Sequence, residues 1–315
     1  MPLAEGEWML SYPGRGIHRG ANYVIGSARS GFPLLQPYEI RYENRSGSES
    51  GPAVLPGEDG VRFGQDRRGA ASITLEVGVD TVDAVGGVGG RHGANLARVS
   101  SLSRAWDAEA VRGEFGAVCE LTTMQGGRER TFFGRPQPLQ PANVRFTRQG
   151  WTSVLLKFDC VDSLSYGAEQ TIRVGMLPAS HPGLKGPLKA PLMLRGPGAS
   201  RVPGQATVAG TTPTWPVITF HGPIVLPMID VYGYWHAQLN VTLGRSEYLT
   251  IDTRPWRRTV LRNGNANAAG WLMRPAPLLR DMRLPTGNVD CILRGTDDTG
   301  NSYMTITWRD AFAYL

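Results

Sequence analysis

The side chains best suited to bind metals or to transfer protons are scattered through this sequence. None of the five histidines stands in an H-E-x-x-H or H-x-x-x-H pattern, the spacings that bring two ligands to one helix face. Cys119, Cys160 and Cys291 are too far apart for a zinc site or a disulfide framework, so they are interpreted as small buried hydrophobes. The sequence therefore predicts no metal site and no cofactor.

Catalytic signatures are equally hard to find. The sequence has no G-x-S-x-G nucleophile elbow. The glycine-rich segment 84–93 lacks the lysine and hydroxyl of a P-loop, and its glycines do not fit G-x-G-x-x-G, so we interpret it as a flexible lead-in to a helix. Carboxylates are plentiful, but the facing pair of a glycosidase leaves no local pattern. We predict no catalytic residue and no enzyme activity, with a cell-wall glycoside hydrolase as the less favoured alternative.

One short stretch could form a contact surface. Tyr232, Tyr234 and Trp235 lie in the sequence YGYW, within a C-terminal half rich in aromatic residues. Exposed aromatic rings stack on sugars, although aromatic residues more often fill cores and protein interfaces. These three residues are the predicted aromatic contact patch.

Composition limits the class of protein. With 315 residues, two domains are expected, and 40 glycines and 23 prolines indicate many turns and mainly β structure. The net charge is +6, but the basic residues are dispersed and only three are lysines, so no sequence-specific nucleic-acid partner is predicted. No run of 18 apolar residues predicts membrane insertion, and no signal-peptide pattern stands at the start, so folding in a cytoplasm is expected.

The first half of the chain predicts strands and one helix. Residues 73–79 and 152–161 alternate apolar and polar side chains, as half-buried strands do. Residues 95–112 predict an amphipathic helix that starts at Asn95 as its cap. Its expected apolar stripe consists of Leu96, Val99, Leu102, Trp106 and Ala110.

The second half predicts a β-sandwich. Leu249 and Ile251 share one face of a strand, and Asn263 with Gly264 predicts a tight hairpin turn. Between the halves, prolines and glycines are dense enough to predict a stiff connector. The expected division is a first domain at 1–175, a connector at 176–213 and a sandwich at 214–315.

Four segments in a fixed order resemble the distal tail protein family of long-tailed, non-contractile phages. Residues 215–230 (WPVITFHGPIVLPMID) look like the family's entry into its second domain, and residues 247–267 resemble its strand, Ile-Asp-Thr, strand, Asn-Gly segment. Residues 284–288 are similar to its L-x-x-G-x-N turn, and residues 305–312 (TITWRDAF) to its closing strand.

This resemblance implies a mainly β structural protein of the virion at the distal end of the tail. It implies a tail-tube-like β-barrel with one flanking helix, here residues 95–112, that builds a hexameric ring, and a galectin-like β-sandwich outside it. The implied partners are the tail tube protein, the tape-measure protein and tail-tip or fibre proteins, with DNA passing through the lumen. The family has no catalytic residues to carry over. The alternative is a carbohydrate-binding module at the tail tip that contacts a host-surface glycan.

Overall fold

The computed structural model describes residues 2–36, 38–42, 53–54, 61–62, 69–143, 145–176, 204–297 and 299–315. The fold is mainly β and every pairing between its described strands is antiparallel, which confirms the predicted fold class. The chain divides into two compact units. Unit 1 is Met1–Gly167 with Phe312–Leu315, and unit 2 is Ala168–Ala311.

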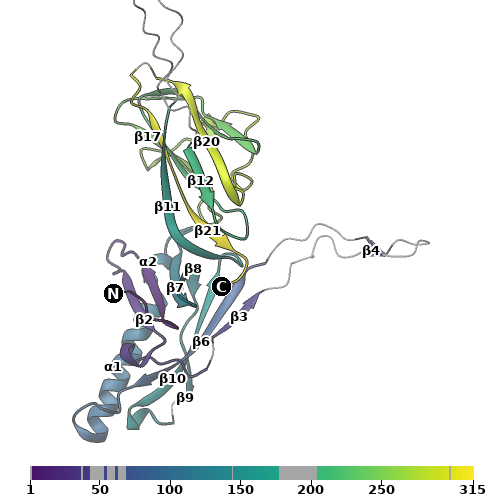
Figure 1. The fold of residues 1–315 in the computed structure, drawn as a ribbon. Helices are drawn as coiled ribbons and strands as arrows, with labels where there is room; N and C mark the ends of the chain where they lie inside the picture. Colours follow the sequence, from purple (N-terminus) through teal and green to yellow (C-terminus); the bar gives the residue numbers. More distant parts are fainter. Residues whose placement is uncertain are drawn as a thin grey trace, which may run out of the picture. The chain divides into compact units, whose positions relative to one another are not determined.

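The strands of unit 1 form one sheet and a separate two-stranded pair. Several of them are labelled in Figure 1. The unit 1 strands are β1 (Trp8–Tyr12), β2 (Ala21–Ile25), β3 (Glu39–Tyr42), β6 (Ala71–Asp80), β7 (Cys119–Gln125), β8 (Arg128–Pro136), β9 (Gln140–Asn143) and β10 (Trp151–Cys160), with β4 (Ala53–Val54) and β5 (Val61–Arg62) paired separately. The hydrogen-bonded path runs β3–β6–β10–β8–β7–β1–β2. Bridges from Gly26 to Pro33 and from Leu34 to Val77 then link β2 back to β6.

The core of unit 1 follows from alternation along its long strands. Ile73, Leu75 and Val77 of β6 are fully buried, and Leu156 and Phe158 of β10 lie beside them on the neighbouring strand. Because successive side chains point to opposite faces, each strand presents one apolar row to the interior. The two strands predicted at 73–79 and 152–161 are thereby confirmed.

Helix α1 (Gly87–Asp107) begins earlier than predicted and is followed by α2 (Glu109–Arg112). Residues 87–93 are helical, so the prediction of a flexible lead-in was wrong there. Each glycine disfavours a helix by about 1 kcal/mol relative to alanine, which is why the sequence pointed elsewhere. Gly90 lies where a Cβ atom would meet the backbone oxygen of Val85 at 2.3 Å, so a close approach requires the glycine.

Two residues of α1, Asn95 and Leu96, differ from the prediction in their burial or their contacts. Asn95 is no cap but a fully buried residue inside the helix, whose amide donates to the carbonyl of Val79 (3.0 Å) and accepts from the hydroxyl of Thr152 (2.6 Å). Leu96 is 48% exposed, while Leu102 and Trp106 enter the core as expected. The buried side of the helix is therefore partly polar at its first turns and apolar at its last.

Unit 2 contains two antiparallel sheets. Its strands are β11 (Ser165–Gly175), β12 (Gly204–Val208), β13 (Val217–His221), β14 (Ile224–Val231), β15 (Trp235–Gln238), β16 (Thr242–Leu243), β17 (Tyr248–Asp252), β18 (Thr259–Arg262), β19 (Ala266–Asn267), β20 (Gly287–Thr296) and β21 (Tyr303–Phe312), where β11 and β21 also extend into unit 1. One sheet runs β19–β18–β17–β13–β21–β11, and the other runs β12–β20–β14–β15 with β16 beside β14. Short 3-10 turns stand at Ala28–Ser30, Thr147–Gln149 and Ala269–Trp271.

Turn residues in unit 2 behave as the sequence predicted. Asn263 and Gly264 take φ angles of 48° and 79° between β18 and β19, the left-handed conformation of a tight hairpin. Leu249 and Ile251 are fully buried. Most of the predicted connector at 176–213 lies outside the described residues, but Gly204–Val208 within it forms β12, which pairs with β20.

Candidate interaction surfaces

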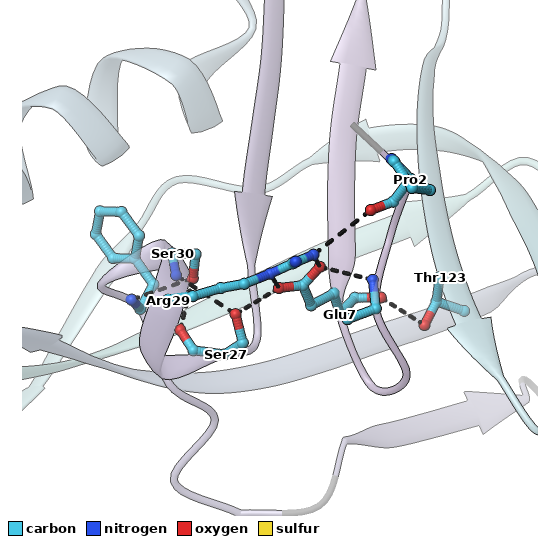
Figure 2. Close-up of polar contacts among 8 residues, drawn as sticks. Pro2, Glu7, Ser27, Arg29, Ser30 and Thr123 are labelled. Atoms are coloured by element: carbon cyan, nitrogen blue, oxygen red, sulfur yellow. Dashed lines mark hydrogen bonds and ion pairs between the residues drawn. The ribbon is translucent and has the colours of Figure 1, made fainter.

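A buried carboxylate fixes the N-terminal strand of unit 1 (Figure 2). Glu7 is fully buried and accepts hydrogen bonds from the Ser27 hydroxyl (2.5 Å), the Ala4 amide (2.8 Å) and the Arg29 guanidinium. The Arg29 hydrogen bonds outweigh the effect of burial and lower the pKa of Glu7 to about 2. The Thr123 hydroxyl donates to the Glu7 carbonyl (3.0 Å), so the residue that directly precedes β1 is held at both its side chain and its backbone.

A tight loop in unit 1 holds an apolar side chain out into solvent. Arg15 and His18 exchange backbone hydrogen bonds of 2.9 and 3.0 Å, and Ile17, 92% exposed, lies at the tip between them. Arg15 forms an ion pair with Glu114, and His18 lies 3.3 Å from the carboxylate of Glu109. The loop is thereby tied to the segment around α2, and the exposure of Ile17 is fixed by these contacts.

A groove of about 530 Å³ runs between this loop and the end of α1. We call it the basic groove. Its charged lining residues are His18, Arg19, Arg104 and Glu109, and Ile17 and Tyr23 are among the others. Glu109 faces His18, whereas neither Arg19 nor Arg104 has an ion-pair partner among the described residues. The groove therefore combines apolar surface with two arginines and one carboxylate, so the formal charge of its lining is +1 with His18 neutral (two positive charges and one negative charge).

The turn before α1 exposes apolar and acidic side chains. We call residues 82–85 the valine turn. The amide of Ala84 donates to the carbonyl of Thr81 (3.0 Å), and the buried Thr81 hydroxyl donates to the carbonyl of Gly150 (3.1 Å). Val82 and Val85 are exposed, Val85 to 96%, and Asp83 between them is exposed as well. The backbone is thus anchored while its side chains face solvent.

In unit 2, the predicted aromatic contact patch is only partly exposed. Tyr232 and Tyr234, 68% and 64% exposed, flank Gly233 in the turn from β14 to β15. Trp235 packs against the core of unit 2, and its indole N–H donates to the carbonyl of Arg283 (2.7 Å). Two of the three residues therefore offer side chains at the surface, and the third supports the turn.

A second aromatic group in unit 2 spans four strands. The rings of His221 and Tyr303 stack at 4.3 Å, the Arg173 guanidinium lies 3.6 Å from the Tyr303 ring, and Tyr248 stands opposite His221. Burial and the charge of Arg173 lower the pKa of His221. Sequence reasoning missed this row because its members lie on β11, β21, β13 and β17, and only the strand register brings them together.

The cysteines and the possible metal ligands form no reactive or metal-binding cluster among the described residues. Cys119, Cys160 and Cys291 are buried, and burial raises the pKa of the Cys119 and Cys291 thiols to about 12. Within the described ranges, no three His, Cys, Asp or Glu side chains gather where a metal could be held. Neither helix in the described part of the chain has the length and apolar character needed to cross a membrane.

The geometry defines a two-unit, antiparallel β protein in which one helix flanks the sheet of the first unit. No protein-family model and no curated protein matches the chain. Solved structures do match it along nearly its whole length. The distal tail protein Dit (gp 19.1) of phage SPP1 has 13% sequence identity and a TM-score of 0.55, and the match covers 97% of this chain and 99% of that one.

A chain of the phage P2 baseplate in its activated conformation with calcium matches with 10% identity and a TM-score of 0.50, over 96% of this chain and 97% of that one. The chain thus has the fold of the SPP1 Dit protein, which is described as a paradigm of the hub adsorption apparatus in phages that infect Gram-positive bacteria. The resemblance to the distal tail protein family is confirmed at the level of the fold.

Proposed function

We propose that this protein is a structural component of the phage virion, the hub ring at the distal end of the tail. The observation that carries this proposal is the likeness in fold to SPP1 Dit, which extends over 97% of the chain and includes both units. In this role the protein joins the tail tube and the tape-measure protein to the tail-tip or fibre proteins. It acts by assembly and is not an enzyme.

Unit 1, which contains most of the predicted first domain at 1–175, is the part that we assign to the ring. Apolar side chains that are almost fully exposed become protein contacts when they gather into a patch. Unit 1 exposes Ile17, Val85, Val88 and Phe115. Unit 2, the predicted galectin-like sandwich, is then the part available to the tail-tip proteins.

The mass of the purified chain in solution tests this proposal. Six copies of the 34.2 kDa chain give about 205 kDa. Light scattering over a dilution series, with negative-stain images, is expected to find rings with a central hole wide enough for duplex DNA. The same measurement is repeated with tail tube protein present as a template. A mass of 34.2 kDa under both conditions contradicts the hub assignment.

A carbohydrate-binding role at the tail tip is a second candidate, favoured by the exposure of Tyr232 and Tyr234. Exposed aromatic side chains supply large contact area at low entropic cost. Under this proposal the chain binds cell-wall glycans in calorimetry, and the Tyr232→Ala, Tyr234→Ala variant loses the binding. Equal glycan binding by the wild type and the variant, or no binding by either, rules out Tyr232 and Tyr234 as the sugar site.

A further inference from the structure

Two surfaces of unit 1 have complementary character. The valine turn (residues 82–85) presents apolar side chains around a negative charge, and the basic groove presents apolar surface around positive charge. We propose that the valine turn of one copy of this chain docks into the basic groove of the next copy. The inference rests on the proposed function and specifies which surfaces close the ring.

The valine turn has the properties of a projecting contact. Asp83 has neither an ion pair nor a side-chain hydrogen bond among the described residues, and Val82 and Val85 beside it are 43% and 96% exposed. The backbone under them is fixed, because Asp80 accepts from the Val82 amide (3.0 Å) and Thr81 bonds to Gly150. A rigid turn loses little conformational entropy on binding, so its exposed side chains are ready for a partner.

The basic groove has the properties of a receptor for that turn. Arg19 and Arg104 are exposed and without ion partners among the described residues, so a carboxylate that enters beside them gains ion pairs without breaking existing ones. The groove's own carboxylate, Glu109, is held 3.3 Å from the His18 ring. Ile17 extends the groove with apolar surface that the ion pairs of its loop hold in place. A desolvated carboxylate between arginine side chains, ringed by aliphatic groups, is a common form of interface centre.

These two surfaces cannot meet within one chain. The valine turn immediately precedes α1, and Arg104 lies in the last turn of the same helix (Figure 1). A helix of 21 residues is about 30 Å long, so its length separates the two surfaces. Contact between different patches on successive copies is a heterologous interface, which forms a closed ring when the rotation between copies closes. A second copy of this chain is therefore the occupant that the arrangement favours.

Charge reversal tests the contact on the full-length chain. In Asp83→Arg the turn becomes positive, and in Arg104→Glu the groove loses a positive charge and gains a negative one. We expect each single variant to fall to the 34.2 kDa monomer in light scattering. An equimolar mixture of the two single variants, and the variant that carries both changes, should regain the wild-type mass, because opposite charges again face each other.

The matched control is Arg257→Glu, an equal charge change at an exposed arginine of unit 2, which should assemble as wild type does. Circular dichroism spectra that match wild type show that the single variants fold, since loss of assembly alone lowers the melting temperature. If wild type forms rings and both single variants form them equally well, another partner or none uses these surfaces, and the inference is overturned while the hub proposal stands. Loss of assembly that the charge swap does not restore also overturns it. A wild type that never assembles removes the hub proposal itself.

Discussion

Glu7 illustrates how a buried charge can serve the fold. Taking a carboxylate out of water is costly unless each of its oxygens finds donors. Here Arg29, Ser27 and the Ala4 amide supply them, and the result joins β1 to the segment after β2. The hydrogen-bonded ion pair between Glu7 and Arg29 therefore links two parts of the chain that are 22 residues apart in sequence.

The Glu7→Gln variant should lower the free energy of unfolding by about 2 kcal/mol, the usual worth of hydrogen bonds to a charged group. Its effect depends on pH. The pKa of Glu7 is about 2 in the folded protein and 4.5 without these contacts, so the stabilisation is complete above pH 4.5 and is lost as pH falls toward 2. Urea unfolding at pH 7 and pH 3 measures both effects.

The matched control is Glu129→Gln, an exposed carboxylate of unit 1, which should change stability by less than about 0.5 kcal/mol. If Glu7→Gln is as stable as wild type at pH 7, or if the difference in free energy of unfolding grows on acidification, the stabilising role of the Glu7–Arg29 ion pair is contradicted. The difference should shrink at pH 3, because wild-type Glu7 then begins to lose the stabilisation that its charge confers.

At the level of elements, alternation and turn chemistry predicted most strands correctly. The rows of β6 and β10 and the Asn263–Gly264 turn are properties of neighbouring residues, so local sequence carries them. Asn95 is different. Its amide satisfies Val79 and Thr152 on two strands distant in sequence, and an asparagine before an apolar stripe reads equally well as a cap. Tertiary contacts decided its role.

The candidate surfaces were predictable to a smaller extent. Tyr232 and Tyr234 follow one another along the chain, so the sequence drew attention to them. The basic groove combines Arg19 from one loop with Arg104 from α1, and their approach depends on how the helix lies on the sheet. Single-sequence patterns carry no information on such distant pairs.

Gly264 offers a test of the hairpin between β18 and β19. Its φ is 79°, and an added Cβ atom would stand 3.0 Å from the Tyr248 hydroxyl. Gly264→Ala should therefore destabilise the protein by about 1 kcal/mol. Gly270→Ala is the control, because Gly270 has no positive φ and no atom within 4 Å of the added Cβ. Thermal melting that finds equal effects for the two variants contradicts the strain argument.

On the scale of the whole molecule, unit 2 is inserted into unit 1. The chain leaves unit 1 after Gly167 and returns at Phe312. The returning residues take part in unit 1, since Arg130 lies 3.8 Å from the ring centroid of Phe312 and the Ser165 hydroxyl donates to the carbonyl of Tyr314 (2.9 Å). Composition marks proline-rich stretches such as the predicted connector at 176–213, but it carries no signal for the residues at which a chain returns to an earlier unit.

Unit 1 should fold without unit 2 if both of its pieces are kept. We expect a chain in which about eight Gly and Ser residues replace 168–311 to unfold cooperatively, since the Ser165 to Tyr314 contact places the two ends close together. Residues 1–167 alone should be about 2–3 kcal/mol less stable, because the contacts to Phe312 and Tyr314 are missing. Calorimetry compares the two, and equal stability contradicts the insertion.

The return of the chain at Phe312 also sets the order of events during synthesis. A ribosome that has made all of unit 2 has not yet made the residues that complete unit 1. Strand β21 (Tyr303–Phe312) ends where unit 1 resumes, so both units depend on the last residues of the chain and neither is complete until synthesis ends.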